Sequence, residues 1–375
     1  MTTTQATLMM TTVALLTFST AAAGDITGSF TLGTGYLDNP LGVNNDTPAG
    51  YLVQALRLST TLSPAPTSDQ MVNNAFKVGY EGNASQFGSD TSLGNIRHGL
   101  GLEWFRTSRV SQQDRRTNSF SAGGQVSLRG YEGYYEVYDY SEAYSYLSFR
   151  QYSGTQNLLT GFAAVRARRY GELPEESYIE PHGQLKFQRF FASRTTLGLS
   201  ARYGLKTYND SAAAVIWDTP SLPSTSQVAA RLNIAQGLSD RLSLRGRVDS
   251  RWTLSDFPYY VADDIFDSPL LDTYAHDGWD VFAAVKWLGP YQVWTELGTS
   301  LGEHDYGSML FATSEFGDTR DDTVRDVYVS LERSLTGKAL GPKLHLAGGW
   351  REQDSSIDTY TYDGIFASST VSWRF

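Results

Sequence analysis

The chain has 375 residues, a formal net charge of −10 and no cysteine. Without cysteine there is no disulfide and no thiolate metal site, and the negative charge argues against nucleic acid as a partner. No apolar run reaches the eighteen or so residues of a membrane-spanning helix. A membrane location would therefore require a β-barrel, the other fold that satisfies the backbone in lipid.

The first 23 residues resemble an export signal. Residues 8–18 are apolar, and Ala21, Ala22 and Ala23 supply the small residues of a cleavage site. No Lys or Arg precedes the apolar segment, which departs from the usual pattern. We expect a signal peptide over residues 1–23 and a single domain over residues 24–375.

After residue 23, apolar and polar residues alternate with a period of two rather than with a helical period. Side chains of an extended chain point to opposite faces in turn, so this alternation predicts strands. The sixteen predicted strands cover residues 27–36, 51–62, 72–82, 95–106, 119–130, 143–152, 157–170, 178–191, 195–208, 226–236, 241–254, 279–287, 291–301, 326–335, 342–351 and 362–375.

The connections between these strands fall into two alternating sets. The short turns are 153–156, 192–194, 237–240, 288–290 and 336–341, and the longer, more acidic loops are 171–177, 209–225, 255–278, 302–325 and 352–361. Outer-membrane barrels have short periplasmic turns and long extracellular loops. The chain is therefore predicted to be an all-β, antiparallel, up-and-down transmembrane barrel of about 16 strands, with both termini in the periplasm.

The last predicted strand ends on Phe375 and carries Val371, Trp373 and Phe375 on its apolar face. This ending resembles the C-terminal signature of Gram-negative outer-membrane proteins, which close on Phe with an aromatic or aliphatic residue two positions earlier. The resemblance implies a protein of the cell outer membrane, surrounded by outer-membrane lipid and lipopolysaccharide. It also implies an assembly signal for the barrel assembly machinery. An edge strand of a soluble sandwich is the alternative.

Charged residues share one face of the predicted strands. Because a charge facing lipid at mid-membrane costs about 2–4 kcal/mol, this face is predicted to line the lumen. The predicted basic pore-lining residues are Arg150, Arg166, Arg168, Lys186, Arg202, Lys206, Arg231, Arg245, Arg247, Arg251 and Lys286. Predicted lumenal acids are fewer: Glu81, Glu103, Asp249, Glu296 and Glu332. Two interpretations stay open: a row of cations that favours anions, or cations paired with acidic loops folded into the barrel.

The third outer loop, residues 131–142, is rich in acids: Glu132, Glu136, Asp139 and Glu142. In general porins, which this topology resembles, the third loop folds inward and its acids face arginines of the wall. The resemblance implies a constriction loop here, although the loop is shorter and lacks the family's Pro-Glu-Phe-Gly motif. Loops 255–278 and 302–325 also hold clustered aspartates, which we interpret as solvated rather than as a metal site.

The five histidines show no catalytic or metal spacing, so neither an enzyme nor a cofactor is expected. The leading hypothesis is a porin-like channel for passive diffusion of small hydrophilic solutes, with anions favoured, because sixteen strands leave an aqueous channel. One alternative is an export pore for an anionic exopolysaccharide, which would need separate periplasmic partners. Another is a plugged barrel that serves as a surface receptor or scaffold. Neither the solute nor association into a homo-oligomer follows from the sequence.

Overall fold

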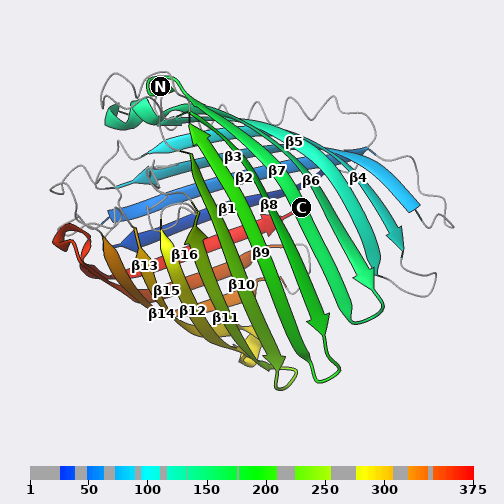
Figure 1. The fold of residues 1–375 in the computed structure, drawn as a ribbon. Helices are drawn as coiled ribbons and strands as arrows, with labels where there is room; N and C mark the ends of the chain where they lie inside the picture. The colour runs from blue at the N-terminus through cyan, green and yellow to red at the C-terminus, as the bar shows by residue number, and fades with distance from the viewer. Residues whose placement is uncertain are drawn as a thin grey trace.

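The computed structural model describes residues 26–38, 49–62, 72–88, 94–109, 116–131, 133–174, 177–208, 224–254, 276–306, 320–336 and 341–375 (Figure 1). The predicted signal peptide lies outside this part of the chain. The strands are β1 (Ile26–Leu37), β2 (Ala49–Leu62), β3 (Val72–Phe87), β4 (Asn95–Arg109), β5 (Thr117–Tyr131), β6 (Tyr140–Ser153), β7 (Asn157–Tyr170), β8 (Tyr178–Phe190), β9 (Thr195–Tyr208), β10 (Thr225–Gly237), β11 (Leu242–Thr253), β12 (Asp277–Leu288), β13 (Trp294–Asp305), β14 (Asp321–Ser334), β15 (Lys343–Ser355) and β16 (Tyr362–Arg374).

These strands form one closed antiparallel barrel, in which each strand pairs with its neighbours in sequence and β1 pairs with β16. Closure removes the unpaired strand edges that promote aggregation. At the seam, Phe30 lies opposite Trp373, and Gly28 and Phe375 exchange two backbone hydrogen bonds of 2.9 and 3.0 Å. The predicted all-β barrel of sixteen strands is confirmed.

The outside of the barrel is apolar and the inside is charged. On β11, Leu244 and Val248 are 40% and 42% exposed on the outer face, while Asp249, one residue further on, is 5% exposed and inside. The exposed large hydrophobic residues continue this apolar face on the other strands, as in Leu100, Leu199 and Leu297. A closed, even-stranded barrel with this alternation has the architecture of transmembrane outer-membrane proteins. No helix among the described residues is long and apolar enough to cross a membrane.

Several strands extend further at the long-loop end than the sequence predicts. Strand β13 continues to Asp305 and β14 begins at Asp321, and these two residues pair across the sheet. Asp305, Asp321 and Asp322 therefore belong to strands, which corrects their predicted place in a loop. Aspartate is unfavourable in strands, but here the continuing ladder outweighs that preference. The predicted loop residues Asp263, Asp264, Asp267, Asp272 and Asp318 lie outside the described residues.

The third outer loop is shorter than predicted. Only residues 132–139 separate β5 from β6, and they include the 3-10 helix η2 (Gly133–Tyr138). Glu142 is consequently a wall residue on β6, which corrects its assignment to the loop. The Asp139 carboxylate accepts a 2.7 Å hydrogen bond from the Tyr131 backbone N–H, and the Glu136 carboxylate accepts one of 3.3 Å from Gly133 N–H. Both carboxylates thus close the loop on itself, and Glu132 lies outside the described residues.

Strand β8 contains a proline in its interior. Proline has no backbone N–H to donate to a sheet, and the pairing of β8 with β9 is interrupted beside Pro181. The pairing stops at Ile179, opposite Thr207, and resumes at His182, opposite Gly204. The inward side chains of Glu180 and Lys206 lie at this interruption, and both are 1% exposed.

Candidate functional site: the charged inner wall

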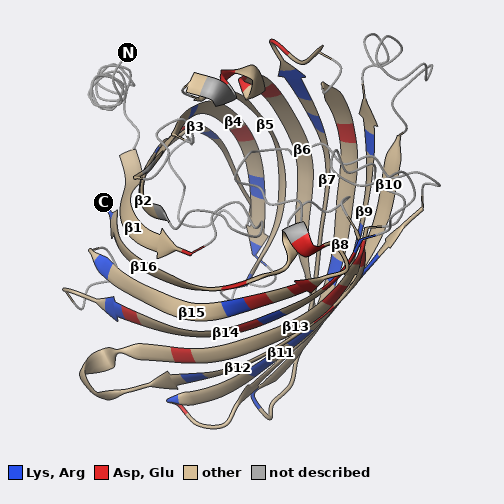
Figure 2. Cartoon of the chain, turned by 90° about the vertical axis from the view of Figure 1, so that its left-hand side faces the viewer, with Lys and Arg blue, Asp and Glu red and all other residues tan. Residues whose placement is uncertain are grey.

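The charged inner wall is where the predicted site residues meet. All eleven predicted basic residues lie on the strand face opposite the exposed apolar one. Acidic and basic segments alternate along neighbouring strands of the wall (Figure 2). The cations therefore share the inner surface with carboxylates of the same strands.

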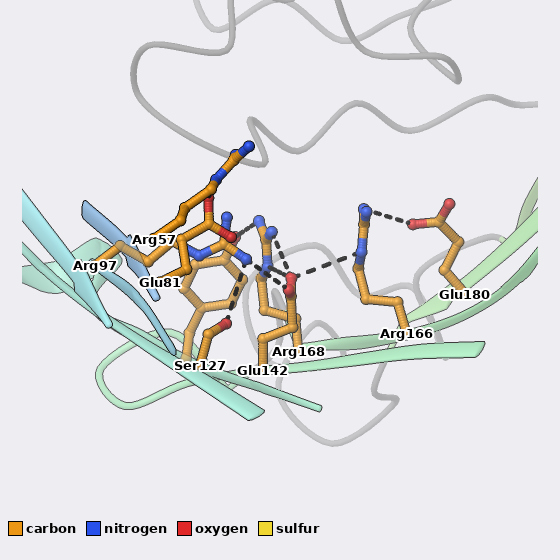
Figure 3. Close-up of polar contacts among 9 residues, drawn as sticks. Arg57, Glu81, Arg97, Ser127, Glu142, Arg166, Arg168 and Glu180 are labelled. Carbon is orange, nitrogen blue, oxygen red and sulfur yellow. Dashed lines mark hydrogen bonds and ion pairs between the residues drawn. The ribbon is translucent and has the colours of Figure 1, made fainter. Parts of the chain in front are cut away.

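Glu142 is the centre of the first cluster, near the long-loop ends of β4, β6 and β7 (Figure 3). Its carboxylate lies 2.8 Å from Arg168 Nη2, 3.3 Å from Arg97 Nη2 and 3.6 Å from Arg166 Nε. The strand register explains the meeting, because Glu142 is directly opposite both Ser127 on β5 and Arg168 on β7. One buried carboxylate thus holds three guanidinium groups.

Glu180 on β8 extends this cluster. Its Oε2 lies 3.2 Å from Arg166 Nη1, and its Oε1 lies 3.4 Å from Nδ1 of His182. Glu142 and Glu180 are both largely buried, at 8% and 1% exposure. Buried charges persist only when they are paired and hydrogen-bonded, so Arg166 is fixed between two carboxylates (Figure 3).

Two of the predicted pore-lining cations are covered by tyrosines. The rings of Tyr140, Tyr170, Tyr178 and Tyr208 form a buried cluster at the long-loop ends of β6 to β9. Arg168 Cζ lies 4.0 Å from the Tyr140 ring centroid, and Lys206 Nζ lies 4.4 Å from that of Tyr178. Such cation–π contacts strengthen when water is excluded. Arg168 and Lys206 are therefore packed inside the wall rather than open to the lumen.

A second cluster lies on β10 to β13. Asp249 lies between Arg231, with which it is hydrogen-bonded, and Arg247, whose Nε is 2.8 Å from Oδ2. Asp280 lies 3.5 Å from Arg251 Nη2 and 3.0 Å from Nε2 of His304. Each carboxylate thus bridges two basic side chains from different positions on the wall.

Two further carboxylates of the wall, on β13 and β14, are paired with arginines of β11 and β15. Glu296 accepts hydrogen bonds from Arg245 and from the Tyr328 hydroxyl, the latter at 2.7 Å. Asp326 lies 2.6 Å from Arg351 Nε and accepts a 2.9 Å hydrogen bond from the Ser300 hydroxyl. The wall carries the carboxylates that partner its own arginines.

Four of the predicted cations have no carboxylate partner among the described residues. Arg202 Nε is buried without a hydrogen-bond partner there. Arg150 donates a hydrogen bond of 2.5 Å to the Tyr152 hydroxyl, and Lys286 Nζ lies 5.0 Å from the Trp294 ring centroid. Lys186 is the fourth.

Three acids of the wall, Glu180, Asp280 and Asp326, were not among the residues predicted from the sequence, and Glu142 was predicted in a loop. A signal for them was present, because Glu180 shares the face of Lys186 at even spacing along β8. Asp280 and Asp326 lie near the strand ends that were predicted too short. The sequence left two interpretations open: a row of cations that favours anions, or cations paired with acidic loops. Neither predicted cations paired with carboxylates of the wall itself.

Pairing does not bury all of these cations. The side chains of Arg231, Arg245 and Arg247 are 46%, 44% and 39% exposed. Their guanidinium groups can therefore meet a solute in the lumen while they remain beside Asp249 or Glu296. Within the described part of the chain, no group of three or more His, Asp or Glu side chains could hold a metal ion.

No family model and no curated protein matches the chain. Among solved structures, it is similar to OccK2 (OpdF) of Pseudomonas aeruginosa in complex with glucuronate, with 13% identity, a TM-score of 0.49 and coverage of 94% of this chain and 98% of that chain. It is also similar to the outer membrane protein OpdK of P. aeruginosa, with 11% identity, a TM-score of 0.48 and coverage of 94% of this chain and 99% of that chain. For OccAB1 of Acinetobacter baumannii, the identity is 9%, the TM-score is 0.49, and the match covers 94% of this chain and 96% of that chain. At these identities and TM-scores, the likeness carries no argument about function.

Proposed function

We propose that this protein is a porin-like channel of the outer membrane that lets small hydrophilic solutes diffuse passively, with a preference for anions. The observation that carries the proposal is the combination of a closed barrel of sixteen strands with a charged, partly exposed inner wall. Side chains fill an eight-stranded barrel, whereas a barrel of sixteen strands encloses an aqueous channel. The inner wall, as far as the structure describes it, is charged, which suits hydrophilic solutes.

The preference for anions rests on the balance of charge along the wall. In the first cluster, three arginines face Glu142 and Glu180. Around Asp249, two arginines share one carboxylate. Arg202 and Lys186 add positive charge without a carboxylate partner among the described residues. A surplus of cations lowers the electrostatic barrier for anions in a pore.

Single-channel recording tests this proposal. The purified barrel is inserted into a planar lipid bilayer, and the current is measured at several KCl concentrations. We expect stepwise, long-lived conductance from the folded, heat-modifiable protein. A folded barrel that inserts but conducts no ions would contradict the proposal and would favour a plugged receptor or scaffold.

A further inference from the structure

A small pocket lies in the inner wall over β2 to β6, beside the first cluster (Figure 3). Its volume is about 240 Å³, below the roughly 300–1,000 Å³ of pockets for drug-sized ligands. Leu102 points outward, where it is 55% exposed, and borders the pocket through its backbone. Six long side chains around the pocket point into the lumen instead: Arg57, Lys77, Glu81, Glu103, Gln125 and Tyr146. The pocket therefore opens to the lumen and has room for one small molecule.

Glycines at inward positions form the floor of this pocket. Gly79 and Gly101 lie directly opposite each other on β3 and β4. The atom nearest to a Cβ at these positions would be a backbone oxygen, at 3.6 and 3.4 Å. Gly123, on β5, lies beneath the Tyr146 ring, since a Cβ there would lie 2.9 Å from two of its atoms. The floor is thus bare backbone, against which a flat ring can lie, and Tyr146 is folded down at its edge.

The rim of the pocket carries two cations and two carboxylates, so its charges cancel. Arg57 lies opposite Glu81 across β2 and β3, and its Nε and Nη2 donate to the same carboxylate oxygen, Oε1, at 2.9 and 2.7 Å. Lys77 lies opposite Glu103 across β3 and β4. An anion meets two carboxylates here and a cation meets two cations, and contacts between like charges are unfavourable. The pocket therefore favours a solute without net charge, unlike the arginine-rich clusters of the wall.

Several polar groups of the rim have hydrogen-bonding capacity that the described residues leave unused. Among those residues, nothing donates to Glu81 Oε2, and neither the Lys77 ammonium nor the Gln125 carboxamide has a partner. A hydroxyl group both donates and accepts hydrogen bonds, so neighbouring hydroxyls suit a rim of mixed donors and acceptors. An amino acid zwitterion would instead need a cation apart from any carboxylate, and each cation of the rim faces a carboxylate.

We propose that this pocket is a binding subsite for a neutral polyhydroxylated solute of the size of one sugar ring. The ring lies on the glycine floor, and its hydroxyls meet Glu81, Lys77 and Gln125. The inference deepens the proposed channel function and rests on it for the route of the solute to the wall. Binding within a channel must be weak enough for release, so we expect an affinity on the order of millimolar.

The test is saturation-transfer NMR of the full, folded chain in a detergent without a sugar headgroup, titrated with D-glucose. Wild type should give a saturable signal, and it should bind D-gluconate, D-glucosamine and L-alanine at least about twofold more weakly. Gly101→Val places a side chain on the floor and should weaken the binding of glucose at least about fivefold. Gln125→Ala removes a hydrogen-bonding group without filling the pocket and should weaken it about two- to tenfold. This second variant keeps the test decisive if Gly101→Val does not assemble.

Two matched controls carry the same substitutions elsewhere on the inner wall. Gly198→Val on β9 and Gln184→Ala on β8 should both bind glucose as wild type does. Unchanged binding in Gly101→Val and Gln125→Ala would overturn the proposal, and so would tighter binding of L-alanine or of a charged analogue than of glucose. The KCl conductance of the same preparation keeps the two proposals apart. A conducting barrel that binds no glucose contradicts the subsite alone, whereas a barrel that binds glucose but conducts no ions contradicts the channel.

Discussion

Glu142 shows how one side chain can hold together three strands of the wall. Arg168, its nearest partner at 2.8 Å, has a side chain that is only 7% exposed. We expect Glu142→Gln to destabilise the barrel by about 3–5 kcal/mol, because a buried guanidinium loses its counter-charge. The measurement is urea unfolding in lipid vesicles. Glu81→Gln is the matched control: its partner Arg57 is 70% exposed, so the loss should be at most about 1 kcal/mol. Equal losses would contradict this account of the cluster.

His276 predicts a dependence of stability on pH. It lies just before β12, with Nε2 2.6 Å from Arg251 Nη1 and its ring 4.1 Å from that of His304. Burial lowers the pKa of His276 well below the usual 6.5, and the positive charges of Arg251 and Arg320 act in the same direction. As the pH falls, His276 is therefore protonated at a higher pH in the unfolded chain than in the folded one.

The free energy of unfolding should accordingly be highest above pH 6.5 and fall below it, by up to about 1.4 kcal/mol per pH unit until the lower folded pKa is reached. His276→Gln removes the titrating group and keeps a hydrogen-bond acceptor for Arg251. Unfolding midpoints at pH 7.5 and 5.5 provide the comparison. We expect a smaller drop in the variant, and an identical drop would show that His276 is not responsible.

At the scale of a strand, β11 tests which face meets lipid. Val248→Arg places a charge against the membrane and should cost about 2–4 kcal/mol near its middle. Arg247→Val, the next residue but on the inner face, should cost much less, because Asp249 keeps Arg231 as its partner. Unfolding in bilayers measures both. If the two substitutions destabilise equally, the assignment of faces on this strand is wrong.

Closure of the barrel depends on the end of β16. Phe375 exchanges backbone hydrogen bonds with Gly28, and a Cβ at Gly28 would lie 2.6 Å from the Phe375 ring. Deletion of Phe375 removes both the hydrogen bonds and the aromatic side chain. We predict less heat-modifiable barrel in the outer membrane, while Phe375→Tyr should assemble well. Normal amounts of folded protein after the deletion would contradict a role for Val371, Trp373 and Phe375 in assembly.

The strands were predictable because one face of each must be apolar, so a period of two appears wherever the wall contacts lipid. The errors in the predicted strands lie at the strand ends. Asp305 and Asp321 continue strands beyond the apolar region, where water solvates the outer face and the alternation disappears. Glu142 was placed in a loop because its neighbours are acidic and aromatic. The pairing of Glu142 with three arginines from two other strands depends on register and could not be read from one segment.

On the scale of the whole molecule, charge is distributed unevenly. The chain carries −10 overall, yet arginines outnumber carboxylates in the first cluster of the wall and around Asp249. Charges in a wet lumen are screened beyond about 8 Å at physiological salt. An excess on the wall therefore influences permeation most where the pore is narrow and the salt is dilute.

The most direct test of an anion-preferring channel is the reversal potential under a KCl gradient. Wild type should give a potential that indicates more permeant chloride than potassium. Replacing Arg166, Arg202 and Arg245 by Gln should lower the anion-to-cation permeability ratio, most strongly at low salt, because two of these changes also remove the arginine partners of Glu180 and Glu296. Arg325→Gln, on the outer face, is the control and should leave the ratio unchanged. An unchanged ratio in an open, conducting triple variant would contradict the account.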